Sequence, residues 1–260
     1  MGKTNIFLVL GLILVMLVGA CTSTSVKSDY SSSNAQSSGN TQQSSQGRAV
    51  FAVKDASADM ESVTSVKTTI DSVKVHSQAE GWTTVSSSSQ TYDWIQLKNN
   101  DKAALLADAQ LKERTYDQVQ IHISNVVVTD SKGTHEAKMP NKDYNIKGNL
   151  LVKADSTSSA TFDFIADESV HATSQGDYVV APVVEYQTKS DATVNAQSSS
   201  DVKISGGQTT TDVKVGMDIN GNVGVGLGIL SNTNLSIDSL GKISVVGQSS
   251  NMLGVGAGSP

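Results

Sequence analysis

The 260-residue chain contains a single cysteine, Cys21, so no disulfide can form within it. Secreted domains that depend on disulfides carry an even number of cysteines, and the common zinc sites need a second one. The histidines do not compensate for this lack, because none has the i, i+4 spacing of a helical metal site; they are His76, His122, His135 and His171. The one thiol therefore needs another explanation.

The sequence also lacks an apolar run long enough to cross a bilayer. The longest run, Ile6–Val18, has 13 residues, so a helix made from it would be about 20 Å long, whereas the bilayer core is about 30 Å thick. Lys3 precedes the run, and Gly19 and Ala20 separate it from Cys21. This order is typical of a cleaved secretory signal.

The end of that segment, Val-Gly-Ala-Cys at residues 18–21, resembles the lipobox of prokaryotic lipoproteins. The resemblance implies a signal peptide over residues 1–20 and a diacylglyceryl group on Cys21. Two acyl chains are enough to hold a protein stably on a membrane. We therefore expect an extracytoplasmic protein, lipid-anchored to the cell membrane; an ordinary secretory signal with an incidental cysteine is the alternative.

Basic clusters and nucleophile motifs are missing as well. The chain has 19 basic and 25 acidic residues, a formal net charge of −6, and no run of Lys and Arg. Nucleic-acid binding needs a concentrated basic surface, so we expect no nucleic-acid partner. No Gly-x-Ser-x-Gly motif is present and the only thiol is at the expected anchor, so we expect no enzyme activity.

Composition divides the remainder of the chain into three parts. Residues 21–47 are dominated by Ser, Gln, Thr and Asn, which predicts a flexible tether. Ten of the 12 aromatic residues lie between Phe51 and Tyr186, and aromatic side chains dominate cores, so we place the folded domain at residues 48–189. Residues 190–260 have no aromatic residue and are rich in Gly and Ser; Asn220-Gly221 predicts one hairpin there, at the domain edge, against another copy, or in a loosely ordered tail.

Within the expected domain the apolar residues alternate with a period of two, which predicts an all-β fold, an antiparallel β-sandwich. Val119, Ile121 and Ile123 share one face of a strand, and a change of phase between Ile70 and Val73 predicts a bulge. Residues 92–97 are expected to be a strand, and Pro182 to mark an edge or a bulge. Residues 101–111, DKAALLADAQL, are the one segment expected to be a short helix.

Five stretches of the domain resemble the family known as domain of unknown function 4382. They are GRAVFAVKDASADMESVTSVKTTIDSVKVH, GWTTV, YDWIQL, LKERTYDQVQIHI and FDFIADESV, in that order. The chain departs from the family at Ser57, where a proline is typical, and at residues 112–116, where a Pro-Gly usually precedes the tyrosine. The resemblance implies a sandwich like transthyretin or the carboxypeptidase regulatory domain on a prokaryotic surface protein. The family has no established activity, so no catalytic residue is carried over.

Two groups of residues are candidates for binding. Two acidic loops offer the oxygen ligands that calcium prefers, although Asp is also a common turn and capping residue; these candidates are Asp55, Asp59, Glu61, Asp163, Asp167 and Glu168. Trp82, beside Gly81 at a strand start, is the aromatic residue expected to be exposed and to stack on a carbohydrate, whereas Trp94 is expected in the core. No cofactor other than calcium is indicated.

These features favour a membrane-anchored, non-catalytic binding or adhesion module with an unknown protein or polysaccharide ligand. The alternative is a structural envelope component that self-associates through its C-terminal region. A surface carbohydrate-active enzyme, which needs two carboxylates about 5–10 Å apart in a cleft, is the third possibility.

Overall fold

The computed structural model describes residues 45–55, 60, 62–99 and 103–247, all within one compact unit that begins at Gln43. Residues 1–44, which carry the expected signal peptide, Cys21 and most of the tether, lie outside the described residues. Within the described part of the chain, neither helix has the length and apolar character needed to span a bilayer.

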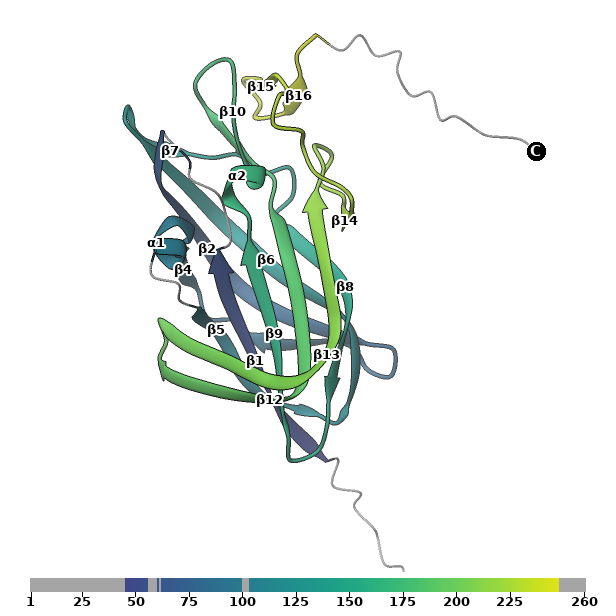
Figure 1. Cartoon of the computed structure of the whole chain (residues 1–260). Coiled ribbons are helices and arrows are strands. Elements are labelled where there is room, and N and C mark those ends of the chain that lie inside the picture. The colour runs from purple at the N-terminus through teal and green to yellow at the C-terminus, as the bar shows by residue number, and fades with distance from the viewer. Residues whose placement is uncertain (1–44, 56–59, 61, 100–102, 248–260) are drawn as a thin grey trace, which may run out of the picture. The chain divides into compact units, whose positions relative to one another are not determined.

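Two six-stranded sheets make up most of this unit (Figure 1). The first has the order β14 (Val223–Val225), β13 (Asp201–Met217), β12 (Val183–Ser198), β9 (Thr157–Phe164), β1 (Gln46–Asp55) and β5 (Ala104–Lys112). The second has the order β3 (Gly81–Ser86), β2 (Val63–Ser77), β6 (Arg114–Asp130) and β7 (Gly133–Glu136), with β4 (Gln90–Asp93) paired to β2 and β8 (Asp143–Val152) paired to β6.

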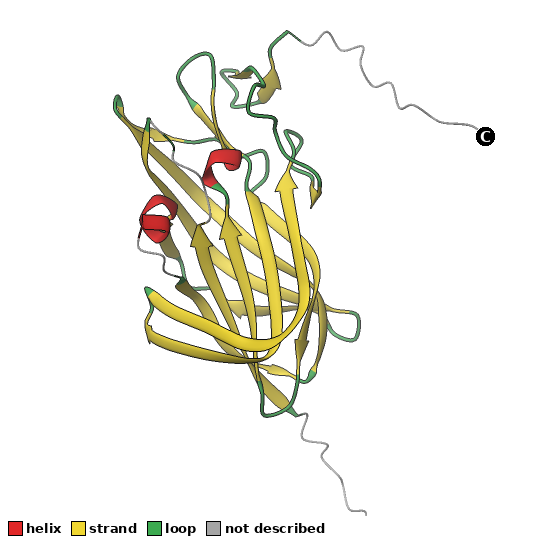
Figure 2. Ribbon diagram, viewed as in Figure 1, coloured by secondary structure: helices red, strands yellow, loops and turns green. Residues whose placement is uncertain are grey.

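The remaining elements are short and lie at the ends of the sheets. They are α1 (Trp94–Asn99), α2 (Ala166–Ser169), the pair β10 (Val170–Ala172) and β11 (Tyr178–Val180), and the pair β15 (Leu235–Ile237) and β16 (Ile243–Val245). Figure 2 shows how little helix the unit contains. The structure confirms the predicted all-β fold.

The two sheets pack face to face around one hydrophobic core, to which both contribute. Alternation along β6 sends Val119, Ile121 and Ile123 into this core, as their period of two predicts. From the other sheet come Phe162 and Phe164, and Phe164 stacks on Trp94 with ring centroids 4.5 Å apart. The predicted bulge in β2 is confirmed, because the pairing with β6 changes register on both sides of Ile70.

Two secondary-structure predictions were wrong. The segment expected to be a helix, residues 101–111, forms most of β5 instead, and β5 pairs antiparallel with β1 along most of its length. Its Ala and Leu residues favour a helix locally, but pairing at the sheet edge and burial of Leu106 and Leu111 outweigh that weak preference. The strand expected at residues 92–97 ends at Asp93 and continues as α1.

The first sheet extends well past residue 189, where the folded domain was expected to end. β12 runs through Lys189 to Ser198, and β13 pairs with it along nearly its whole length. Pro182, expected to mark an edge or a bulge, lies in neither strand but in the break between β11 and β12. The hairpin predicted at Asn220-Gly221 is present and joins β13 to β14 at the sheet edge.

The long β12–β13 hairpin bends over the outer side of its own sheet (Figure 1). Near its tip, Val202 pairs with Ala103 and packs with Ala52 of β1 in a second, small apolar cluster. β1 is therefore covered on both faces, which explains why it is buried along nearly all of its length.

The two ends of the sandwich differ in what they carry. The described chain enters at β1, where the carbonyl of Ser45 accepts a hydrogen bond from the backbone N–H of Glu113 in the β5–β6 turn. β1 and β9 are parallel, so α2, which follows β9, lies at the opposite end. Ten residues of strand separate the two ends, a distance of about 30 Å.

Candidate functional site

Trp82 is the only aromatic residue among the exposed large hydrophobic side chains of the described residues, with 45 % of its surface accessible. It follows Gly81, whose φ of +70° ends the β2–β3 turn in a conformation that favours glycine. The indole packs edge-on against His76, with ring centroids 5.2 Å apart, and His76 Nδ1 lies 2.6 Å from Asp117 Oδ1. The exposed ring predicted from the sequence is therefore present and held by neighbouring strands.

Polar side chains surround Trp82 on the outer face of the second sheet. Strand register aligns Trp82 with His76, then Gln118 and Lys147 across four strands. The next row contains Thr84, Lys74, Gln120 and Asn145, and Gln120 Nε2 donates to Asn145 Oδ1 at 2.8 Å. We call these eight residues the Trp82 face. It combines the indole of Trp82 and the imidazole of His76 with amide, hydroxyl and ammonium groups, which is the chemistry that can stack on and hydrogen-bond a sugar.

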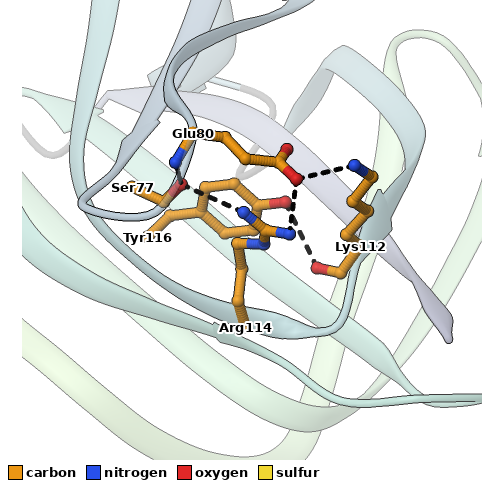
Figure 3. A network of polar contacts seen from close by, with 5 residues as sticks. All are labelled: Ser77, Glu80, Lys112, Arg114 and Tyr116. Atoms are coloured by element: carbon orange, nitrogen blue, oxygen red, sulfur yellow. Dashed lines mark hydrogen bonds and ion pairs between the residues drawn. The ribbon is translucent and has the colours of Figure 1, made fainter. Parts of the chain in front are cut away.

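A polar network fixes the turn that carries Trp82 (Figure 3). Glu80 Oε1 accepts hydrogen bonds from Lys112 Nζ at 2.6 Å and from Arg114 Nη2 at 2.9 Å. Its backbone N–H donates to Ser77 Oγ. The hydrogen bond from Lys112, and then that from Arg114, lower the pKa of Glu80.

Tyr116 lies beneath this network and joins it to the core. Its ring is buried, and its hydroxyl donates to the carbonyl of Lys112, four residues upstream, at 3.2 Å (Figure 3). This is the geometry of a tyrosine corner. The β2–β3 turn and the β5–β6 turn are thus tied to one another.

The structure brings only part of the acidic candidate set together. Parallel pairing of β1 with β9 places Lys54 beside Asp163, at 3.5 Å, and Asp55 one residue further on. Burial raises the pKa of Asp163, and Lys54 opposes that shift. Asp59 and Glu61 lie outside the described residues.

The other acidic candidates, Asp167 and Glu168, lie in α2, and Glu168 accepts a hydrogen bond from Lys214 Nζ at 2.6 Å. Both Asp163 and Glu168 thus already pair with a lysine. Among the described residues, no three His, Cys, Asp or Glu side chains are grouped as a metal site.

A cavity that the sequence did not indicate lies at the α2 end of the first sheet. Its volume is about 710 Å³, and α2, β13 and the glycine-rich residues 225–231 line it. His171 lines it as well and is 6 % exposed; burial lowers the pKa of its ring. Gly216 lets residue 227 approach closely, because a Cβ there would lie 2.1 Å from the Leu227 carbonyl oxygen.

Comparison with known proteins gives one match. A family model described as "Domain of unknown function (DUF4382)" matches residues 46–182, just over half of the chain. No curated protein and no solved structure matches the chain. The matched segment contains the Trp82 face and ends before β12, so the strands that complete the first sheet lie beyond it.

Proposed function

Because the chain belongs to the DUF4382 family, whose function is unknown, we propose a function from its own residues: a lipid-anchored, non-catalytic module that binds a polysaccharide outside the cytoplasm. The proposal assigns lipid attachment to Cys21 and ligand contact to the Trp82 face. It includes no cofactor and no catalytic residue. Calcium stays a prediction for the acidic residues.

The exposure of Trp82 is the observation that carries this proposal. Core aromatic residues in this chain are buried, whereas Trp82 is 45 % accessible on a strand whose neighbours are polar. Indole presents a large apolar surface with few rotatable bonds, so it contacts a ligand at low entropic cost. The surrounding amides of Gln118, Gln120 and Asn145 supply both donors and acceptors for hydroxyl groups.

A lipid anchor on Cys21 and the polar segment that follows it would present the Trp82 face to ligands outside the membrane. Two acyl chains on Cys21 would hold the protein to the membrane. A polar segment of about 25 residues then separates Cys21 from Gln46, the start of β1. As the flexible tether predicted from its composition, the segment would give the sandwich reach toward a polymer near the membrane.

Binding to polysaccharides tests the proposal directly. Full-length protein is incubated with purified peptidoglycan and, in separate assays, with soluble chitin and cellulose oligosaccharides, and bound protein is measured. We expect one of these probes to bind, and Trp82→Ala to weaken it about tenfold or more, because loss of an anchoring aromatic costs over 1 kcal/mol.

The matched control is Leu240→Ala, which removes another exposed apolar side chain, 92 % accessible, far from the Trp82 face in sequence. It should bind as the unaltered chain does. If Trp82→Ala and the unaltered chain bind a probe equally, the Trp82 face is not the ligand site. The same conclusion follows if the unaltered chain binds none of the probes.

A second candidate function is that of a structural envelope component that self-associates through the C-terminal region. The observation in its favour is a set of exposed apolar side chains between Val225 and Val246. Light scattering of the purified chain and of Leu230→Lys would distinguish the two, because a self-associating protein would show a multiple of the 27.2 kDa chain mass that the lysine reduces.

A further inference from the structure

The cavity at the α2 end of the first sheet has a buried polar atom without a partner in its wall. His171, on β10, lines the cavity and is 6 % exposed. Its Nε2 atom is buried and has no hydrogen-bond partner among the described residues. A buried polar atom that makes no hydrogen bond costs free energy, so a ligand that supplies the missing bond gains affinity.

The other ring nitrogen of His171 determines which kind of group can supply that bond. Burial lowers the pKa of His171 and favours the neutral ring, while a hydrogen bond to the backbone of Glu168 opposes this shift. A backbone group that raises the pKa of a histidine is a carbonyl accepting from the ring, and because Nε2 has no partner, we assign the ring proton to Nδ1. Nε2 is then an acceptor, and it needs a donor such as a hydroxyl group.

Five apolar side chains line the same cavity and favour a ligand with an apolar body. They are Val183, Val225, Leu227, Ile229 and Leu230. Two of them, Val225 and Leu230, are 74 % and 75 % accessible, so contact with an apolar ligand would remove part of their surface from water. The cavity volume of about 710 Å³ lies in the range of small-molecule sites.

The charged groups of the cavity wall favour an uncharged ligand. They are Asp167, Glu168 and Lys214. Lys214 Nζ already donates to Glu168 Oε1 at 2.6 Å, and Asp167 has an interaction of its own. A charged ligand would lose its hydration among the apolar side chains, and groups that are already engaged would not compensate for that loss.

We propose that this cavity binds an uncharged amphiphile, a molecule with an apolar body and one hydroxyl group, and that the hydroxyl donates to His171 Nε2. The apolar body lies against Val183 and the apolar side chains of residues 225–231. This inference is independent of the polysaccharide ligand, because it uses no residue of the Trp82 face.

Two isomers of the formula C8H18O test the proposal: 1-octanol, which has a hydroxyl donor, and 1-methoxyheptane, which has none. Calorimetry measures their binding to the full-length chain carrying Cys21→Ser, so that no detergent competes for the cavity. We expect 1-octanol to bind about fivefold more tightly, because only it can complete the hydrogen bond. The nitrogen NMR resonance of His171 Nε2 should move when 1-octanol is added and stay in place with the isomer.

Substitutions separate the hydrogen bond from the apolar contact. His171→Phe keeps a ring and removes the acceptor, so 1-octanol should bind no better than 1-methoxyheptane, whose own affinity should be unchanged. Leu230→Ala removes an exposed side chain of the cavity wall and should weaken both isomers equally. Leu240→Ala removes a side chain that is 92 % accessible and is not part of the wall, and it should weaken neither.

Four results would overturn the proposal. Equal affinity for the two isomers, with no movement of the Nε2 resonance, would mean that His171 accepts nothing from the ligand. Failure of both isomers to bind would show that the cavity holds no amphiphile. Tighter binding of octanoate than of 1-octanol would assign the ligand contact to Lys214 and a negative charge. Binding of 1-octanol that weakens as the protein concentration rises would show that a second copy of the chain covers the cavity.

Discussion

The hydroxyl of Tyr144 donates a buried hydrogen bond of 2.8 Å to the backbone carbonyl of Val215. Tyr144 lies on β8 of the second sheet, and Val215 lies on β13 of the first. This bond joins the segment matched by the family model to a strand beyond it. The sandwich therefore depends on residues that follow the matched segment.

Tyr144→Phe should destabilise the protein by about 1–2 kcal/mol, because the buried Val215 carbonyl would lose its donor. Urea unfolding measures the change in the free energy of unfolding. Tyr186→Phe is the matched control: Tyr186 is equally buried, but its hydroxyl has no hydrogen-bond partner among the described residues. Removing that hydroxyl should leave stability unchanged or raise it; equal losses in both variants would contradict this account of Tyr144.

A chain that ends at Lys189 should not unfold cooperatively, whereas one that ends at Gly247 should. The shorter chain lacks β13, and with it the buried side chains of Val215 and Met217 and the acceptor of the Tyr144 bond. Each buried aliphatic side chain contributes about 1.5–3 kcal/mol, which is a large share of the stability of an ordinary domain. Thermal melts followed by near-ultraviolet circular dichroism provide the comparison, and two equally sharp transitions would place the domain end at Lys189 after all.

Much of the sandwich follows from local pattern. Strict alternation in Val119, Ile121 and Ile123 identified β6, and the change of phase after Ile70 identified the bulge in β2. These features could be predicted because a strand with one buried face has apolar residues at every second position of its sequence. Trp94 was also correctly expected in the core, although a helix carries it.

Features that depend on pairing between strands far apart in the chain could not be predicted from the sequence. β5 resembles a helix in composition and becomes a strand only because β1 offers an edge. β13 has a polar sequence without aromatic residues, so its place in the first sheet was missed. Likewise, only the parallel pairing of β1 with β9 brings Lys54 to Asp163, which no sequence spacing reveals. For the site, the exposure of Trp82 was predicted, but its polar neighbours come from three other strands.

The acid stability of the sandwich should depend on Asp130. The Tyr178 hydroxyl donates to Asp130 Oδ2 at 2.8 Å and, with the backbone N–H groups of Lys132 and Gly133, lowers the pKa of Asp130 to about 2 from 3.8. A lowered carboxyl pKa stabilises the folded state above the unfolded pKa, and this contribution is lost as the pH falls through the folded pKa. We therefore expect the loss between about pH 4 and pH 2.

The measurement is urea unfolding at several pH values across that window. Asp130→Asn should show a shallower decline in stability than the unaltered chain, and Tyr178→Phe should move the decline to higher pH. Parallel profiles for all three proteins would mean that Asp130 does not couple to folding.

Gly216→Ala should disturb the glycine-rich side of the cavity. The added methyl group would lie 2.1 Å from the carbonyl oxygen of Leu227, far inside van der Waals contact, so one of the two segments must move. We expect a loss of about 1–3 kcal/mol in unfolding free energy and faster amide exchange at residues 225–231. Gly224→Ala, whose methyl group would meet only the Leu227 side chain at 3.3 Å, is the milder comparison. A similar loss of unfolding free energy in both variants would show that the close approach of Leu227 to Gly216 does not require glycine.

Cys21→Ser should release the protein from membranes. Without a thiol no diacylglyceryl group can be attached, and the short apolar run before it is too short to span the bilayer. Fractionation of expressing cells, with blotting of membrane and soluble fractions, gives the answer. Ser23→Ala, two residues away, should stay with the membrane fraction, and retention of Cys21→Ser there would exclude lipid attachment at this residue.

The position of β1 between β9 and the edge strand β5 has a mechanical consequence. β1 begins at Gln46 and pairs with β5 on one side and β9 on the other, with eight residues in register on each. A force transmitted along the preceding chain would pull β1 along its own axis, across hydrogen bonds that run perpendicular to it on the β5 side and slanted on the β9 side. Those bonds would share the load and fail together, whereas the bonds of an edge strand pulled sideways would open one at a time. If the protein binds a ligand and is anchored as proposed, a pull on the ligand would load β1 in shear rather than peel it from the sheet.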